Sequence, residues 1–182
     1  MNAARIRALV VVGTLMVGAL TLVFVTVHRD TQTHADYLAG CPARSVIVVT
    51  SPLPNRNEVT VKVWNASSRP GLAETVAEQL RHRGYQVQKV GPKDNKPTIE
   101  GVAAIYYGPR TVGGAWVVRA ELLMTDIGQM DAMHFNIKST STVVDLVLGR
   151  DFRQLGAITE VNQALAALGT PDAPPGTCAQ RG

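Results

Sequence analysis

A short polar loop between a predicted strand and a predicted helix carries the residue types best suited to ligand binding. It offers the amide of Asn65, the hydroxyls of Ser67 and Ser68, the guanidinium of Arg69 and the backbone of Gly71. Free backbone N–H groups at the start of a helix favour anions or polar oxygens. We therefore expect this loop to accept a phosphate or carboxylate of a glycan. The same residue types also shape turns and cap helices, so a structural role for Asn65 and a serine is the alternative.

A second basic cluster, Arg150, Asp151 and Arg153, follows the end of another predicted strand. At a sheet edge, these residues either bind an acidic partner or form a solvated pair with a helix-capping acid. An alternative hypothesis joins Arg150 and Arg153 to Arg69 as a clamp for a pyrophosphate. The protein would then be an enzyme or accessory factor acting on lipid-linked glycans.

The sequence offers little for catalysis or metal binding. It has no nucleophile-elbow serine, no His-Glu-x-x-His motif and no phosphate loop, and its four histidines and two cysteines lack metal-ligand spacing. Asp145 interrupts an apolar strand, where we expect it to be buried, but one carboxylate is not an active site. Trp116, on a predicted helix, either stacks on a sugar or packs in the core. We expect no enzymatic activity, no metal and no cofactor.

Periodicity and turn residues predict the elements that position these groups. Alternation of apolar and polar residues, or a short apolar run, predicts strands at 45–50, 59–64, 85–90, 102–107 and 143–148. Apolar residues at helical spacing predict helices at about 70–83, 112–124 and 154–168, with residues 125–141 mainly loop.

The order of these elements predicts an α+β fold. Strand, helix, strand, strand, helix, strand is the ferredoxin-like βαββαβ arrangement, a two-layer sandwich with helices on one face of a sheet. The strand at 45–50 and the C-terminal helix are expected as an added edge strand and an added helix.

Residues Ala8–Val27 form an uncharged, apolar run of twenty residues. A helix of that length rises about 30 Å, which matches the hydrocarbon thickness of a bilayer. We therefore predict a transmembrane helix rather than a core helix or a cleaved signal peptide, whose apolar stretch is shorter. Arg5 and Arg7 precede the run and only Arg29 follows it, which favours a cytoplasmic N-terminus in a single-pass plasma-membrane protein.

Cys41 and Cys178 flank almost everything after the apolar run. An even cysteine count on a non-cytoplasmic domain favours a disulfide, which would tie the ends of the domain together. The competing interpretation is a lipoprotein box, because Leu38, Ala39 and Gly40 precede Cys41. Thirteen residues separate Cys41 from the apolar run, which argues against lipidation.

The stretch from Val59 to Val90 resembles the opening of the LytR C-terminal domain family. The matching residues are Trp64-Asn65, Gly71-Leu72-Ala73 and Gly84-Tyr85-Gln86-Val87, and later Ala104–Tyr107 and the Leu-Gly-x-Asp-aromatic end at Leu148–Phe152. Trp64 replaces a smaller apolar residue, and both cysteines lie outside the resembling segment. The resemblance implies the stand-alone, membrane-anchored form found in actinobacterial envelope proteins. It transfers no phosphotransferase activity.

The predicted organisation is a cytoplasmic tail at 1–7, a transmembrane helix at 8–27 and a tether with an extra strand at 28–57. The LytR C-terminal-like domain follows at 58–153, and a C-terminal helix with a disulfide-pinned tail at 154–182. Three of the 18 basic and one of the 14 acidic residues lie in the first thirty positions, so the rest carries a net charge of only +2. This near-neutral charge argues against a nucleic-acid partner. We expect a non-enzymatic cell-envelope integrity protein that binds wall glycopolymer or envelope-assembly proteins.

Overall fold

The structure is a computed structural model that describes residues 13, 16, 18, 19, 21, 41, 45–92, 99–123 and 133–181. The chain divides into two compact units, Met1–Pro42 and Ala43–Gly182. Most of the predicted span 8–27, and all of the predicted tail 1–7, lie outside the described residues. Among the residues that are described, no helix is both long enough and apolar enough to cross a membrane.

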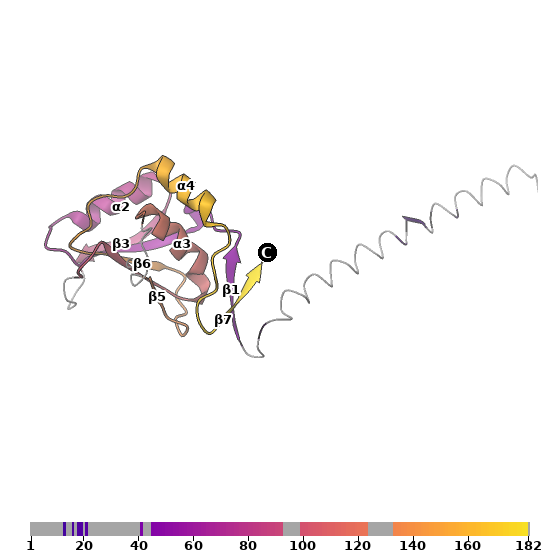
Figure 1. The fold of residues 1–182 in the computed structure, drawn as a ribbon. Helices are drawn as coiled ribbons and strands as arrows, with labels where there is room; N and C mark the ends of the chain where they lie inside the picture. The colour runs from indigo at the N-terminus through magenta and orange to yellow at the C-terminus, as the bar shows by residue number, and fades with distance from the viewer. Residues whose placement is uncertain are drawn as a thin grey trace, which may run out of the picture. The chain divides into compact units, whose positions relative to one another are not determined.

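The second unit is built on a five-stranded sheet (Figure 1). Its strands, in spatial order, are β3 (Gln86–Pro92), β2 (Thr60–Asn65), β6 (Val144–Leu148), β4 (Ala103–Tyr107) and β5 (Met133–Phe135). Strands β3, β2 and β6 are parallel to one another, β4 runs antiparallel to β6, and β5 runs parallel to β4. The fold is therefore mixed α+β, as the sequence predicts.

The ferredoxin-like strand order is wrong. That topology separates the first two core strands by the third, whereas β2 and β3 are direct parallel neighbours and β4 lies beyond β6. It also places the last strand at an edge, and β6 lies at the centre, between β2 and β4. The physical reason is burial, since four of the five β6 side chains are buried. A strand this apolar needs cover on both faces and a neighbouring strand on each side, which only a central position provides.

Helices α2 (Leu72–His82) and α3 (Val112–Glu121) cover one face of this sheet. The strands turn apolar residues toward these helices, and residues such as Val61, Ile105 and Leu146 are fully buried beneath them. Short 3₁₀ turns, η1 (Arg56–Glu58) and η2 (Pro109–Thr111), precede β2 and α3. Helix α4 (Ile158–Leu168) packs against α3 and is the added C-terminal helix that the sequence predicts.

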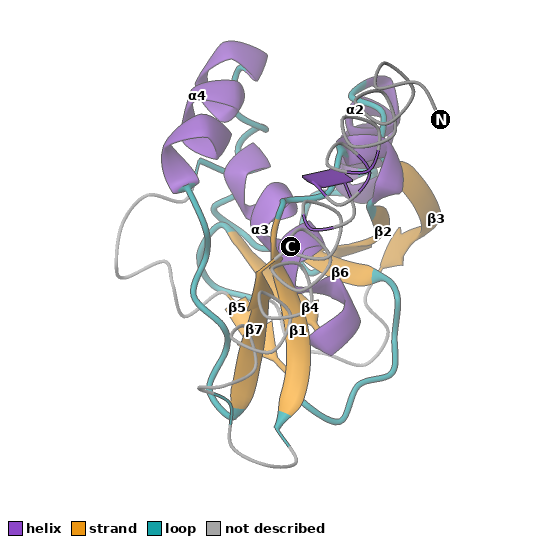
Figure 2. Ribbon diagram, turned by 90° about the vertical axis from the view of Figure 1, so that its right-hand side faces the viewer, coloured by secondary structure: helices purple, strands orange, loops and turns teal. Residues whose placement is uncertain are grey.

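The extra strand does not extend the main sheet. Strand β1 (Val46–Ser51) pairs in parallel with β7 (Thr177–Arg181), and the two form a separate ladder (Figure 2). The prediction of an added edge strand is therefore wrong. Its partner β7 comes from a proline-rich tail with no strand periodicity, and β5 is a three-residue strand inside a segment predicted as loop.

Cys41 and Cys178 form the disulfide that the sequence favours, and neither thiol is free. Cys178 belongs to β7, so the bridge and the β1–β7 ladder both hold the C-terminal tail. A bridged Cys41 sulfur cannot carry a lipid. The lipoprotein interpretation is therefore wrong.

Candidate functional site

The two predicted polar clusters meet at one edge of the sheet. Strands β2 and β6 are parallel and place Asn65 in register with Leu148, so the segments that follow them begin side by side. The backbone N–H of Ala66 donates to the carbonyl of Leu148 at 2.9 Å. Ligands of open sheets with parallel strands bind outside the carboxyl ends of those strands, which is where these segments lie.

Asn65 organises the loop that follows β2. Its Oδ1 accepts hydrogen bonds from the Ser67 backbone N–H at 3.0 Å and from the Ser67 hydroxyl at 2.7 Å. Its Nδ2 donates to the carbonyl of Arg69 at 2.6 Å, and the Arg69 N–H donates to the Ser67 hydroxyl at 3.2 Å. Asn65 and Ser67 thus hold the loop in one conformation.

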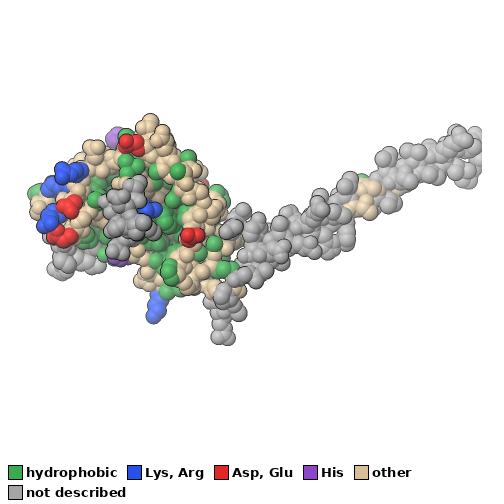
Figure 3. Space-filling view, in the orientation of Figure 1, with side chains coloured by type: hydrophobic (Ala, Val, Ile, Leu, Met, Phe, Trp, Pro, Cys, Tyr) green, Lys and Arg blue, Asp and Glu red, His purple; other side chains and the backbone are tan. Residues whose placement is uncertain are grey.

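The three arginines of the predicted clamp are engaged differently. The Arg69 guanidinium donates to the carbonyl of Phe152, which ties the β2 loop to the segment after β6. Arg150 forms ion pairs with Glu100 and, at 3.9 Å, with Asp151. Arg153 is exposed. Figure 3 shows basic and acidic side chains close together on the left of the domain. Two of the three guanidiniums are used within the protein, which favours loop organisation over a pyrophosphate clamp.

Gly71 begins helix α2 in a left-handed conformation, with φ of +74°. No side chain in the described part of the chain caps this helix, so the expectation that a serine caps it is wrong. Ser68 is exposed beside it. The N–H groups of the first turn of α2 therefore have no side-chain cap, and of the residues that carry them Glu74 is exposed, Leu72 half-buried and Ala73 buried.

Gly149 locks the segment after β6 against the turn before β4. A Cβ at this position would lie 2.3 Å from the carbonyl oxygen of Gly101, so only glycine fits. The Gly149 N–H donates to the Val102 carbonyl and the Asp151 N–H to the Gly101 carbonyl, both at 2.9 Å. These contacts explain the Leu-Gly-x-Asp-aromatic pattern, whose aromatic residue, Phe152, is buried in the core.

A family model described as "LytR cell envelope-related transcriptional attenuator" matches residues 58–152. The chain belongs to this family. The LytR C-terminal domain thus begins just before β2 and ends at Phe152. All residues of the two predicted ligand-binding clusters fall inside it except Arg153. The disulfide, β1, α4 and β7 lie outside the match.

A solved structure is also similar to this LytR C-terminal protein. It is the soluble domain of a conserved hypothetical secreted protein from Mycobacterium marinum, with 27% sequence identity and a TM-score of 0.51. The similarity covers 69% of this chain and 83% of that one. Among curated proteins, none matches.

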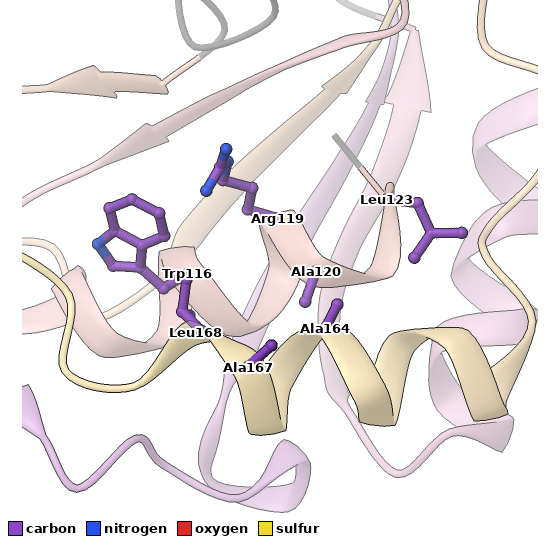
Figure 4. Close-up of a pocket in the computed structure, with 7 residues that line it drawn as sticks. All are labelled: Trp116, Arg119, Ala120, Leu123, Ala164, Ala167 and Leu168. Carbon is purple, nitrogen blue, oxygen red and sulfur yellow. The ribbon is translucent and has the colours of Figure 1, made fainter. Parts of the chain in front are cut away.

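The LytR C-terminal domain also packs against α4, leaving a groove of about 270 Å³ between α3 and α4. Figure 4 shows Trp116 and Arg119 at one end of this groove, Leu123 at the other and alanines between them. The Arg119 guanidinium lies 4.8 Å from the centre of the Trp116 ring, and burial lowers the Arg119 pKa. Trp116 packs partly buried against the core, which supports the core-packing interpretation of this residue.

A buried ionic network, which sequence reasoning missed, centres on Glu121 at the end of α3. Its side chain is fully buried and accepts hydrogen bonds from Arg56 at 2.8 Å, from Arg83 and from the Tyr85 hydroxyl at 2.9 Å. Burial and the Glu121 carboxylate raise the pKa of Tyr85. Burial alone would lower the pKa of Arg56, but its hydrogen bond and attraction to Glu121 outweigh burial and raise it. The sequence did hold a signal for this network. Glu121 comes three and four residues after apolar helix positions, which places it on their side of the helix.

Proposed function

We propose that this protein acts outside the cytoplasm as a non-enzymatic component of the cell envelope. Its LytR C-terminal domain would bind a wall glycopolymer, or an envelope-assembly protein, rather than catalyse a reaction. The family description is cell-envelope related, and the similar Mycobacterium marinum protein is described as secreted. The disulfide supports the same compartment, because such bonds persist in oxidising surroundings.

The predicted transmembrane helix at 8–27 would hold the domain at the plasma membrane, with residues 1–7 in the cytoplasm. Residues 28–57 would then serve as tether, extra strand and loop, and residues 58–153 as the binding domain. Residues 154–182 would add the C-terminal helix and the tail that the disulfide holds in place. Twenty uncharged apolar residues support this arrangement.

The binding edge we propose comprises Asn65, Ser67, Ser68, Arg69 and Gly71, with Arg150 and Arg153 beside them. The observation that carries the proposal is the preformed loop at the uncapped start of α2. Because Asn65 and Ser67 already order the backbone, a ligand oxygen would meet the uncapped N–H groups of Leu72 and Glu74 at little entropic cost. An anionic or polar group on a wall glycopolymer has the matching chemistry.

Co-sedimentation of the full-length protein, kept in detergent, with insoluble purified cell walls tests this function. The Ser68→Asp variant places a carboxylate where the ligand anion would sit, while the new charge favours the helix dipole and so preserves folding. We expect retention of the unmodified protein and at least tenfold weaker retention of Ser68→Asp. Thr140→Asp is the matched control, since it adds the same charge at an exposed site before β6, far along that strand from the binding edge.

The same full-length protein also tests the alternative partner, an envelope-assembly protein. If cell walls fail to retain the protein, immobilised full-length protein is offered a detergent extract of envelope membranes. Retention by neither material refutes the proposed function.

A further inference from the structure

The face of the main sheet turned away from α2 and α3 carries a row of polar and aromatic side chains. Strand register places Lys62 opposite Asp145, Asp145 opposite Tyr106 and Tyr106 opposite His134, so four strands contribute to one line. Trp64 lies two residues after Lys62 in β2 and therefore on the same face. We call these five residues the aromatic row. His134 is exposed and the other four are half-buried, so all of them reach the surface.

The side chains of the aromatic row hold one another in place. The Tyr106 and His134 rings stack with centroids 4.6 Å apart and planes 21° apart. Trp64 donates its indole N–H to Oδ1 of Asp145 at 2.8 Å. Trp64 and Tyr106 also pack on Ala104 and Val147, which are buried beneath them. A preformed surface of this kind loses little side-chain freedom when a ligand binds.

The chemistry of the row matches a sugar ring. The C–H groups of a pyranose pack against the electron-rich faces of aromatic rings. Asp145 retains acceptor capacity beyond the Trp64 hydrogen bond, since a carboxylate offers about four lone-pair sites, and it can accept from sugar hydroxyls. Lys62 supplies a donor, and its charge balances that of Asp145. The row therefore suits a hydroxyl-rich ligand better than a strongly charged one.

The aromatic row is a poor match for a protein partner. The large aliphatic or methionine side chains that are exposed in the described part of the chain are Met16, Ile47, Val49, Ile137 and Ile158, and none belongs to a strand of the main sheet. Protein interfaces are also rich in tyrosine and tryptophan, but their buried centres are more apolar than this face and poor in charged residues such as Lys62 and Asp145.

We propose that the aromatic row is a sugar-binding subsite for the glycan chain of the cell wall. This inference rests on the proposed function, because it assigns the sugar part of the same polymer whose polar group the β2 loop would bind. Trp64 directly precedes Asn65 at the end of β2, so the row reaches the strand end from which the β2 loop starts, although the two side chains point to opposite faces of the sheet.

The test measures retention of the full-length protein on insoluble cell walls that have been treated with protease to remove bound proteins. We expect Tyr106→Ala and His134→Ala to weaken retention about tenfold, and Tyr106→Phe to keep it within twofold, because the ring rather than the hydroxyl provides the contact. His82→Ala is the matched control, since His82 is exposed at the end of α2, away from the row. Cooperative urea unfolding of each variant shows that its fold is intact, and the exposed His134 keeps the test valid if Tyr106→Ala unfolds.

The outcomes separate the two proposals. If the unmodified protein stays on the walls and both alanine variants stay equally well, the sugar subsite is refuted while the proposed function stands. If protease treatment alone abolishes retention, the ligand is a wall-bound protein, and the sugar subsite is refuted. If untreated walls and envelope extract also retain nothing, the proposed function fails and the sugar subsite with it.

Discussion

The buried Glu121 network makes a quantitative prediction about stability. Replacing Glu121 with glutamine keeps the shape of the side chain but removes its negative charge. The carboxylate is fully buried, whereas the side chains of Arg56 and Arg83 are 22% and 19% exposed. In the variant, both guanidiniums would lose their counterion, and the glutamine N–H₂ would face donors.

The structure sets the expected size of the loss. Removing one partner of a buried ion pair costs about 3–5 kcal/mol because the other charge is left uncompensated. Water reaches part of both arginines, and the remaining glutamine oxygen still accepts one hydrogen bond, so we expect the lower end of that range. A loss of about 3 kcal/mol should lower the melting temperature of a domain of this size by roughly 10 °C.

Urea unfolding of the full-length protein, analysed by linear extrapolation, measures this loss. Glu78→Gln is the matched control. Glu78 pairs with Arg81 at 3.6 Å, and their side chains are 70% and 47% exposed, so its loss should stay below about 1 kcal/mol. If Glu121→Gln loses less than about 1 kcal/mol, or no more than Glu78→Gln, the network does not stabilise the fold as we infer.

Three further predictions concern stability. The pKa of Tyr85 is raised in the folded state, so the unfolded protein releases this proton first, near pH 10. The free energy of unfolding should therefore fall as the pH rises further, by up to about 1.4 kcal/mol per pH unit. Tyr85→Phe should flatten that fall in urea unfolding at pH 9–11. Gly149→Ala should lower the unfolding free energy by about 3 kcal/mol, because its Cβ would overlap backbone, whereas Gly91→Ala meets open space and should change it by less than about 1 kcal/mol; equal losses in thermal melts would contradict this. Reduction of the Cys41–Cys178 bridge should lower the unfolding free energy by about 4–5 kcal/mol, and intact-mass analysis before and after reduction should differ by two hydrogens with no lipid attached.

Most elements were predictable from the sequence because their signals are local. The alternation of Val59, Val61 and Val63 with polar residues marks β2, and Gly84 marks the end of α2. The family resemblance depended on the same local patterns, and the family match confirms it. By contrast, β5 and β7 lack such patterns, since they are short strands stabilised by the neighbours they pair with.

The candidate loop was found by residue type, but its internal bonding was not. Sequence reasoning identified Asn65 and Ser67 as ligand donors or turn formers, and only the coordinates show that each hydrogen-bonds within the loop. Asp145 was expected in a buried position. It is half-buried on the helix-free face, where Trp64 binds it, because the strand alternates toward two different faces.

Local sequence thus determined most of the strands and helices, though not β5 or β7, as well as the apolar side of those elements and the family to which the chain belongs. The tertiary structure decided the lateral order of the strands, the burial of Glu121 among two arginines and a tyrosine, and the line from Lys62 to His134 across four strands. The reason is physical. Periodicity along a chain records whether a side chain is covered, but the neighbour that covers it depends on packing among segments far apart in sequence.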